Sequence, residues 1–191
     1  MANKHKYLMP INFQRLNLNV PFIREDIDSL LQIKIAVQWF KPELILHEKL
    51  ISLIESFGTI KIVNCVLLYY PATDTPSLIH SDDAGVFDQT NLNFVIGGTG
   101  SKVFWYDTIS EYSGDIVTTP WSPRPTYDIN KMIVSESTEI LGACLLQAGT
   151  PHNVVNPIED RYCIIVKLKN INSEWLTWSS ALHLFNRYIV R

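Results

Sequence analysis

Four residues in this chain have the types and the spacing of a metal centre with a binding site for an anion. His80 and Asp82 are separated by one residue, and His152 follows much later in the chain. In an extended segment, His80 and Asp82 point to the same face, because strand side chains alternate with a period of two. Two imidazoles and one carboxylate on one side of an ion, with the other positions open, suit non-haem Fe(II) that binds a co-substrate and dioxygen. Arg161, nine residues after His152, adds a cation that can bind a carboxylate through two hydrogen bonds.

Each of these residues has a simpler interpretation when it is considered alone. A single His on an apolar face is more often a hydrogen-bonded core residue than a ligand, and three histidines keep that interpretation: His5, His47 and His183. Asp82 alone could cap a turn, and Asp83 competes with it as a ligand. Arg161 alone is compatible with a surface salt bridge. The combination is stronger because His152 begins one strand segment and Arg161 begins the next, so a hairpin would return Arg161 to the neighbourhood of His152.

The composition indicates a folded protein and disfavours nucleic acid as a partner. The chain has 191 residues, of which 47% are hydrophobic and 18% are charged, as expected for one folded domain with a sizeable core. Its net charge is −3 and it has no run of Lys and Arg, whereas binding to a phosphate backbone needs a positive surface. We expect a small-molecule or peptide substrate, and either a monomer or a homodimer.

The cysteines and the apolar segments indicate the compartment. Cys65, Cys144 and Cys163 lie in apolar runs without Cys-x-x-Cys spacing, so we expect buried free thiols in a reducing environment. The segment MANKHKYLMPINFQRLN lacks the apolar region of a secretory signal peptide, and no apolar run approaches the ~18 residues that cross a bilayer. We therefore expect a soluble, cytoplasmic protein that does not insert into membranes.

A change in residue type after Gly58 separates a flanking region from a β-rich core. In residues 1–58 a helix is expected over 43–57, because Pro42 suits a first turn, the apolar spacing is helical and Gly58 suits a C-terminal cap. Within residues 59–168, segments rich in β-branched and aromatic residues alternate with turns, which predicts short strands. These segments are TIKIVNCVLLYY, SLIHSDD, NLNFVIG, SKVFWYD, CLLQA and RYCIIVKLK. They predict a mainly β, two-sheet antiparallel sandwich with flanking helices.

Three other segments have less regular sequences. LNLNVPFI, residues 16–23, is compatible with a short strand. Residues 107–139 have few periodic apolar positions, so we expect a long functional loop or a lid there. Residues 172–190 predict an amphipathic C-terminal helix. Its apolar side would be formed by Trp175, Trp178, Leu182 and Phe185.

With this ligand set and these strands, the chain resembles the Fe(II)/2-oxoglutarate-dependent oxygenases, and in particular small members similar to prolyl hydroxylases and aspartyl or asparaginyl hydroxylases. Their motif is His-x-Asp, then His, then Arg, on a double-stranded β-helix, which is a jelly-roll, cupin-like sandwich. The resemblance covers about residues 60–168. It implies that His80, Asp82 and His152 bind iron and that Arg161 binds the far carboxylate of 2-oxoglutarate.

The resemblance also implies further site residues. Tyr69-Tyr70-Pro71 resembles the Tyr-x-Pro element of prolyl-hydroxylase-like members, whose Tyr hydroxyl helps to hold 2-oxoglutarate, so Tyr69 is expected in that role. NLNFVIGGTGSKVFWYD is similar to the strand pair after His-x-Asp in small members, and on that likeness Asn93 points into the site. The family often has Ser or Thr two residues after the Arg, where this chain has Cys163. Candidate substrate contacts are Trp105, Trp121 and Arg124.

The activity implied by the resemblance is hydroxylation of an unactivated C–H bond with dioxygen, coupled to conversion of 2-oxoglutarate to succinate and CO2. The substrate would be a small molecule, an amino acid or a peptide side chain. Two alternatives stay open from the residues alone. A cupin-like metal-binding jelly roll would perform isomerase, epimerase or O2 chemistry without 2-oxoglutarate, but it needs no carboxylate clamp such as Arg161. A non-enzymatic binding sandwich would leave His80, Asp82, His152 and Arg161 unexplained together.

Overall fold

The chain folds into antiparallel β-sheets with a few short helices, so the expectation of a mainly β protein with flanking helices is confirmed. The computed structural model describes residues 6–12, 27–32, 34–73, 75–82, 88–109, 113–118, 123–156 and 158–190. The segment 16–23, where a short strand was an option, lies outside the described residues. In the described part of the chain, no helix is long and apolar enough to cross a membrane.

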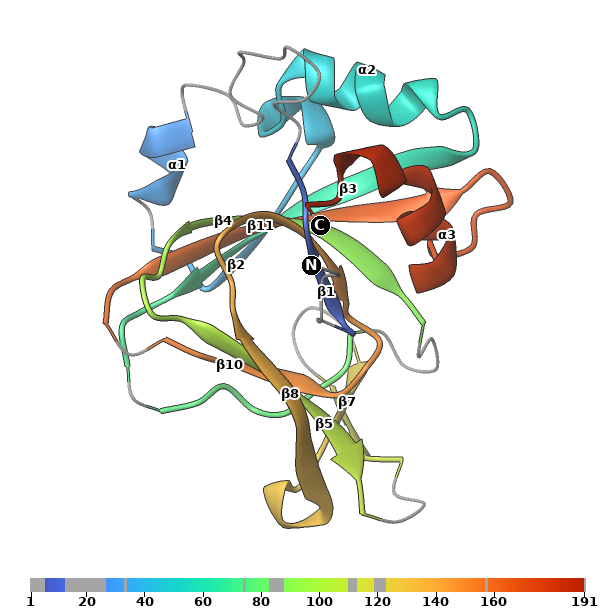
Figure 1. Cartoon of the computed structure of the whole chain (residues 1–191). Coiled ribbons are helices and arrows are strands. Elements are labelled where there is room, and N and C mark those ends of the chain that lie inside the picture. The colour runs from blue at the N-terminus through green and yellow to red at the C-terminus, as the bar shows by residue number, and fades with distance from the viewer. Residues whose placement is uncertain are drawn as a thin grey trace.

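The largest sheet has six strands in the order β1-β9-β4-β11-β3-β2. Their bounds are β1 Leu8–Pro10, β2 Val37–Phe40, β3 Ile60–Tyr70, β4 Thr90–Gly97, β9 Gly142–Gln147 and β11 Arg161–Asn170. A second sheet has the order β10-β5-β8, with bounds β5 Lys102–Thr108, β8 Met132–Glu139 and β10 His152–Val155. A separate hairpin is formed by β6 Asp115–Thr118 and β7 Pro123–Thr126. Figure 1 shows the helices on one side of the six-stranded sheet and the β10-β5-β8 sheet on the other.

The strand pairs of the two larger sheets are nested within one another along the sequence. The innermost pair is β5 with β8, and the next pair outwards is β4 with β9. Outside these, the short segment at His80 pairs with His152 at the start of β10 through an isolated bridge. The outermost pair is β3 with β11. Successive pairs lie alternately in the β10-β5-β8 sheet and in the six-stranded sheet, so the first and second halves of the core run side by side over their whole length.

Two apolar cores lie on opposite faces of the six-stranded sheet. Alternate residues of β11 such as Ile164 and Val166 pack against the helices, in one core with Leu50 and Phe185. The other core lies between the two larger sheets and includes Trp105, Cys144 and Cys163. The three cysteines are free and buried, as expected from their apolar surroundings.

The N-terminal flanking region contains α1 Asp28–Leu31, a 3-10 helix at Pro42–Leu44 and α2 Glu48–Ser56. The helix expected over 43–57 is therefore shorter at its start. The reason is a cap, because Nδ1 of His47 accepts a hydrogen bond from the Lys49 amide at 3.2 Å and starts α2 there. At the other end the amide of Gly58 donates to the Glu55 carbonyl, and the positive φ of +70° at Gly58 ends the helix as expected.

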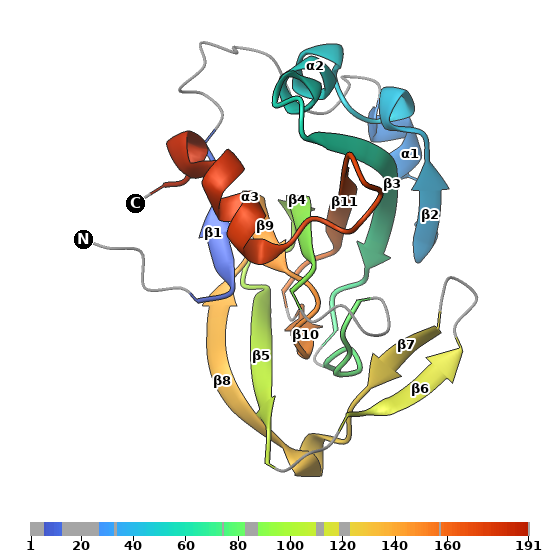
Figure 2. The same cartoon turned by 90° about the vertical axis from the view of Figure 1, so that its right-hand side faces the viewer.

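The expectation of a long loop at 107–139 is wrong. This segment contains the β6–β7 hairpin, a 3-10 helix at Ile129–Lys131 and β8, which pairs with β5 along its length. Figure 2 shows the hairpin at the lower right and β8 at the lower left, both below the helices. These strands have no alternating apolar pattern because β6 is exposed throughout and β8 is mostly exposed, so burial does not select apolar residues on one face.

The expectation of one long helix over 172–190 is also wrong. The helix α3 spans only Trp178–Leu184, followed by a 3-10 helix at Asn186–Tyr188. Trp175 lies before it and forms a β-bridge with Lys169 at the end of β11. Thr177 then caps α3 by accepting a hydrogen bond from the Ser180 amide.

Candidate metal centre

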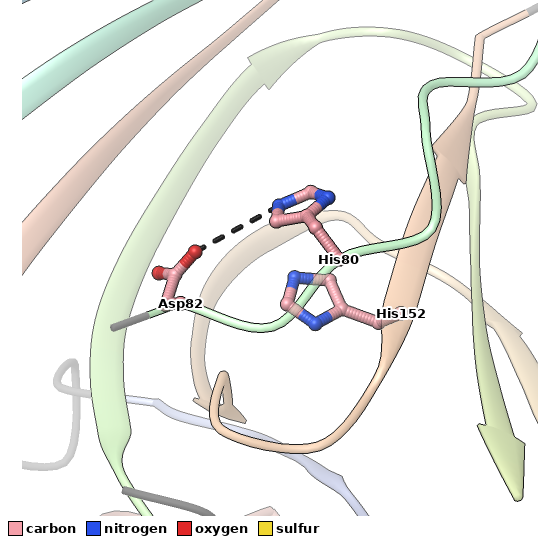
Figure 3. A group of neighbouring side chains, drawn as sticks. All are labelled: His80, Asp82 and His152. Carbon is pink, nitrogen blue, oxygen red and sulfur yellow. Dashed lines mark ion pairs between the residues drawn. The ribbon is translucent and has the colours of Figure 1, made fainter. Parts of the chain in front are cut away.

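The two histidines predicted as ligands face each other across a hydrogen-bonded backbone pair. The His80 amide donates to the His152 carbonyl at 2.9 Å, and the His152 amide donates to the His80 carbonyl at 2.8 Å. Directly opposed residues in an antiparallel pair place their side chains on the same face. The two imidazole rings therefore lie next to each other, with centroids 4.7 Å apart, as Figure 3 shows.

Each imidazole is oriented by a backbone carbonyl two residues earlier in the chain. Nδ1 of His80 lies 2.8 Å from the Leu78 carbonyl, and Nδ1 of His152 lies 2.8 Å from the Thr150 carbonyl. A carbonyl oxygen only accepts, so Nδ1 is the protonated nitrogen in both rings. The lone pair is then on Nε2 in each ring, which is the arrangement found in metal-binding histidines whose other nitrogen donates to a carbonyl.

Asp82 has one carboxylate oxygen held by neighbours and the other turned towards the imidazoles. Oδ2 accepts hydrogen bonds from Asn91 Nδ2 at 2.9 Å and from Lys167 Nζ at 3.1 Å. Oδ1 lies 3.7 Å from Nε2 of His80, the contact drawn as a dashed line in Figure 3. The ligand atoms of His80, Asp82 and His152 all lie within 4.8 Å of one another. The three side chains can therefore hold a metal ion, and Asp83, the competing carboxylate, lies outside the described residues.

The protonation states of the three side chains leave their ligand atoms able to bind a metal ion. Burial, followed by the neighbouring His152, lowers the pKa of His80 to about 3, and burial also lowers the pKa of His152, so both rings are neutral at physiological pH. Burial alone would raise the pKa of Asp82, but Lys167 and the two imidazoles lower it below its ordinary value, so Asp82 is ionised. Two neutral imidazoles and one carboxylate are the donor set of a divalent transition metal.

The triad borders a cavity of about 500 Å3 that lies between the sheets. Four residues of β11, spaced two apart, line this cavity on one face of the six-stranded sheet: Arg161, Cys163, Ile165 and Lys167. The neighbouring strands of the same sheet contribute residues at the same spacing, among them Asn91 and Asn93 of β4. The period of two along these strands decides which side chains share the cavity with His80, Asp82 and His152.

Arg161, for which the sequence predicted a role in anion binding, is 2% exposed and lines the cavity. Its guanidinium lies over the Tyr70 ring, with 5.5 Å from the central carbon to the ring centroid. Its Nε is buried and has no hydrogen-bond partner among the described residues. A buried guanidinium nitrogen without an acceptor is costly, so the cavity is suited to an anionic ligand at this position.

The absence of a side chain at Gly98 leaves room for the Arg161 side chain. Gly98 has a φ of +72°, and a Cβ at this position would lie 2.7 to 2.8 Å from three carbons of the Arg161 side chain. Real Cβ atoms do not approach neighbours this closely, so only glycine fits beside the stem of Arg161.

The structure favours Tyr70 over Tyr69 as the tyrosine of the site. Tyr70 is directly opposite Arg161 in the β3–β11 register, so the two side chains share the cavity face. Tyr69 is opposite Tyr162, and its hydroxyl donates to Asp160 at 3.0 Å. Tyr69 also borders the cavity, so its expected role beside 2-oxoglutarate stays a prediction.

The remaining predicted residues divide into two groups. Asn93 lines the cavity, and its buried Oδ1 has no partner among the described residues. Arg124, on β7, also lines the cavity. Trp105 is instead fully buried in the core between the sheets, where it stacks on Tyr7 with a centroid distance of 5.7 Å, and it is not among the lining residues. Trp121 lies outside the described residues.

Arg161 reaches the cavity by a different route from the expected hairpin. β10 belongs to the three-stranded sheet and β11 to the six-stranded sheet, so the chain crosses between sheets after His152 instead of pairing back on itself. Asn156 holds this crossing, because its side-chain amide donates to the carbonyls of Tyr70, Pro71 and Glu159. The same Asn156 accepts a hydrogen bond from the Ser101 hydroxyl.

Sequence reasoning missed the two residues that hold Asp82, which are Asn91 and Lys167. A signal for both was present in the alternation of the strands. Lys167 is six residues after Arg161, and Asn91 is two residues before Asn93, so each shares a face with a residue that had been singled out. Asn91 and Lys167 are also directly opposite each other in the β4–β11 register.

Comparison with known proteins adds no family to these observations: no protein-family model and no curated protein matches the chain. What the geometry supports directly is a mainly antiparallel β protein in which buried His80 and His152, together with Asp82, form a possible site for a metal ion.

Proposed function

We propose that the protein is an Fe(II)- and 2-oxoglutarate-dependent oxygenase that hydroxylates a C–H bond of a small molecule, an amino acid or a peptide side chain. The observation that carries this proposal is one cavity bordered both by the His80, Asp82 and His152 donor set and by the buried, unpartnered Nε of Arg161. A three-ligand metal site beside a cation is the arrangement that binds a metal-chelating dicarboxylate.

The nesting of the strand pairs supports a jelly-roll architecture for this oxygenase. A jelly roll has eight strands in two sheets, formed when a long antiparallel ribbon folds over on itself. The pairs β5–β8, β4–β9, the His80 segment with β10, and β3–β11 make up such a ribbon, and they alternate between the two larger sheets. In this arrangement His80 and His152 belong to one strand pair of the ribbon, and Asp82 follows His80 by two residues.

The residues of the chain divide the work of binding between them. His80, Asp82 and His152 would hold the iron, and the iron, when bound, would supply the activation of dioxygen. Lys167 and Asn91 donate hydrogen bonds to Oδ2 of Asp82, and the charge of Lys167 keeps the carboxylate ionised. Oδ1 is then directed towards the imidazoles, where it would bind the metal. Arg161 would bind the far carboxylate of 2-oxoglutarate, and Tyr70 would support its guanidinium from one face. Burial of these groups between the sheets limits the access of water to the site.

A cupin-like metal site without 2-oxoglutarate is the main alternative, and the surroundings of Arg161 argue against it. Isomerase or epimerase chemistry at the metal requires no second anion site. The chain nevertheless buries Arg161 to 2% exposure without an acidic partner among the described residues, and it keeps Gly98 beside its stem. Such an arrangement destabilises the protein unless an anion binds there.

The proposal is tested by anaerobic titration of the purified protein with Fe(II) and 2-oxoglutarate, monitored by visible absorption. A weak charge-transfer band that requires both components is expected, because 2-oxoglutarate chelates the metal through its 1-carboxylate and keto oxygen. The band should vanish in His80→Ala. In Arg161→Gln it should form only at about ten- to a hundredfold higher 2-oxoglutarate, since a charge-assisted hydrogen bond contributes roughly 1.5–3 kcal/mol. Arg187→Gln, which removes the same charge from an exposed position, serves as the control.

Two results would contradict the proposal in different ways. Iron binding without a 2-oxoglutarate band would support the cupin-like alternative. No iron binding in a folded protein would leave a sandwich whose histidines have only a structural role.

A further inference from the structure

Arg124 is a second arginine in the cavity, and it comes from a different part of the fold from Arg161. It lies on β7, in the hairpin opposite Val117 of β6, and its side chain lines the same cavity as the metal triad. Arg124 was expected in a loop as a candidate substrate contact; in the structure it is only partly exposed and its Nε is buried.

The backbone around Arg124 is tied directly to the segment that contains the metal ligands. The Ser81 amide donates to the Pro125 carbonyl at 3.2 Å, and the Tyr127 amide donates to the Ile79 carbonyl at 3.0 Å. His80 also forms an isolated bridge with Thr126. Prolines at 123 and 125 restrict the backbone on both sides of Arg124. Arg124 therefore lies on a strand whose position relative to His80 is fixed by backbone hydrogen bonds.

Arg124 has no anionic partner in the described part of the chain. Its Nε has no hydrogen-bond acceptor, and no ion pair joins it to a described Asp or Glu. Among the described residues that line the cavity, Asp82 is the only acid, and it is paired with Lys167 at 3.1 Å. A partly buried arginine whose counter-charge is missing indicates a ligand that supplies it.

Among the described cationic residues that line the cavity, Arg124 is the one to which the proposed function assigns no role. Lys167 neutralises Asp82, and Arg161 is assigned to the far carboxylate of 2-oxoglutarate. A divalent metal with one coordinated carboxylate of 2-oxoglutarate still has a net positive charge. The loaded cavity would therefore carry excess positive charge on the metal side and on Arg124, which attracts an anionic substrate and repels a cationic one.

We propose that Arg124 binds a carboxylate of the substrate, so that the enzyme acts on a small carboxylic acid and not on a neutral or cationic compound. This inference rests on the proposed function, because it takes Arg161 as the co-substrate residue. A carboxylate fits better than a phosphate monoester, since the latter carries about −1.5 to −2 charges at neutral pH and one arginine balances one of them. The cavity of about 500 Å3 accommodates two small molecules and excludes a large one.

The test uses the full-length protein with Mn(II) in place of iron, together with 2-oxoglutarate, so that no turnover occurs. The probes are matched pairs of N-acetyl amino acids and the corresponding primary amides, which differ in one charge. Proton relaxation of each probe by Mn(II), measured by NMR, reports binding close to the metal. We expect the wild-type protein to bind at least one acid about ten- to a hundredfold more tightly than its amide, the range of a charge-assisted hydrogen bond.

The variants separate Arg124 from the rest of the cavity. Arg124→Gln should lose the preference for the acid while it keeps Mn(II) and 2-oxoglutarate affinities within about twofold of wild type, because its charge is assigned to the substrate alone. Arg124→Lys should retain part of the preference, since it keeps the charge but not the planar fork. Arg187→Gln, at an exposed site outside the cavity, should behave as wild type.

Equal relaxation of acids and amides by the wild-type protein, including none from either, overturns the inference. A preference that survives in Arg124→Gln also overturns it, as does a loss of 2-oxoglutarate affinity in that variant. The same pairs are measured on metal-free protein by saturation transfer, so the preference for carboxylates is judged even without a metal complex. Failure of wild-type protein to form the Mn(II) and 2-oxoglutarate complex counts instead against the proposed function.

Discussion

At the scale of single residues, the metal triad is organised by its own backbone. His80 and His152 each bind the carbonyl two residues earlier, and Asp82 is held by Asn91 and Lys167. These contacts exist within the protein itself, so the side chains adopt a binding geometry without a ligand to arrange them. A site prepared in this way loses less conformational entropy when it binds a metal.

Replacement of Gly98 is expected to weaken the binding of 2-oxoglutarate. Gly98→Ala should displace the Arg161 side chain, because the added Cβ would lie 2.7 to 2.8 Å from three of its carbons. We expect the 2-oxoglutarate dissociation constant to rise by about tenfold, while Mn(II) affinity stays within about twofold, because the metal ligands are untouched. Both constants are measured by titration of the folded variant.

Gly58→Ala is the matched control for this substitution. Gly58 has nearly the same φ, +70°, but a Cβ there meets nothing within 4 Å. Both variants should lose about 1–2 kcal/mol of stability through the left-handed backbone conformation, and only Gly98→Ala should lose 2-oxoglutarate. Unchanged 2-oxoglutarate affinity in Gly98→Ala would mean that the Arg161 side chain can shift away from the added methyl group and still bind the co-substrate.

The choice between Tyr69 and Tyr70 shows a limit of prediction at this scale. The pairing of His80 with Asp82 could be predicted because His-x-Asp in an extended segment needs only local geometry. The face of a tyrosine on β3 depends on its register with β11, about ninety residues away, and a slip of one residue exchanges the two faces. The residues around the Tyr-Tyr-Pro sequence contain no information about that register.

At the scale of elements, the connection from β10 to β11 is the part of the chain that joins His152 to Arg161. Asp160, the residue before β11, accepts hydrogen bonds from Lys34, Tyr69 and the Ala72 amide. This carboxylate therefore ties the crossing to the end of β3 and to the segment before β2. The position of Arg161 follows from these ties, because Arg161 is the next residue in the chain.

The pKa of Asp160 gives a prediction for this connection. The hydrogen bond from Lys34, followed by those from Ala72 and Tyr69, lowers the pKa of Asp160 from its ordinary value of 3.8 to about 2. A lowered pKa in the folded state stabilises the protein above the unfolded pKa, and this contribution is lost as the pH falls through the folded value. The stability advantage of the wild type over Asp160→Asn should thus be constant above about pH 5 and shrink between about pH 4 and pH 2.

Thermal unfolding of both proteins across that pH range measures the difference directly. Acid unfolding caused by other carboxylates affects both proteins alike and cancels in the comparison. A stability difference that does not change with pH would mean that Asp160 contributes through its shape and not through its charge.

Element prediction succeeded where burial imposes a pattern and failed where it does not. β4, β11 and the middle of β3 are buried on both faces, and the continuous apolar runs of these strands identified them. β6 and most of β8 are exposed, so nothing selects apolar residues there, and the segment resembled a loop. The long C-terminal helix was expected because the spacing of aromatic residues continued past Thr177, although Thr177 is a good N-cap residue.

At the scale of the whole molecule, two cores share one sheet, and a cysteine lies in each of them. Cys65 belongs to the core on the helix side and Cys144 to the core between the sheets. Burial raises the pKa of each thiol from an ordinary value of 9.0 to about 12. Their reactivity therefore reports on the opening of the two faces of the sheet separately.

We expect both thiols to be protected in the native protein and exposed together on unfolding. At about pH 8 the native thiolate fraction of each is about a thousandfold lower than in the unfolded chain, because that pH lies below both pKa values. Alkylation with iodoacetamide over a urea series, with the modified sites identified by mass spectrometry, should give one midpoint for Cys65 and Cys144. Alkylation of one at lower urea than the other would mean that the two cores open independently.

The nesting of the strand pairs has a consequence for synthesis of the chain on the ribosome. Every strand of the first half, β3 to β5, leaves the ribosome before its partner in the second half has been made. β5 and β8 can pair first, β3 must wait for β11, and His80 must wait for β10. During this interval the apolar faces of β3 and β4 are uncovered, which is when a nascent chain is most exposed to aggregation. The three side chains that could hold a metal ion are complete only after His152 has emerged, so any binding of a metal at this site belongs to the last steps of the protein's production.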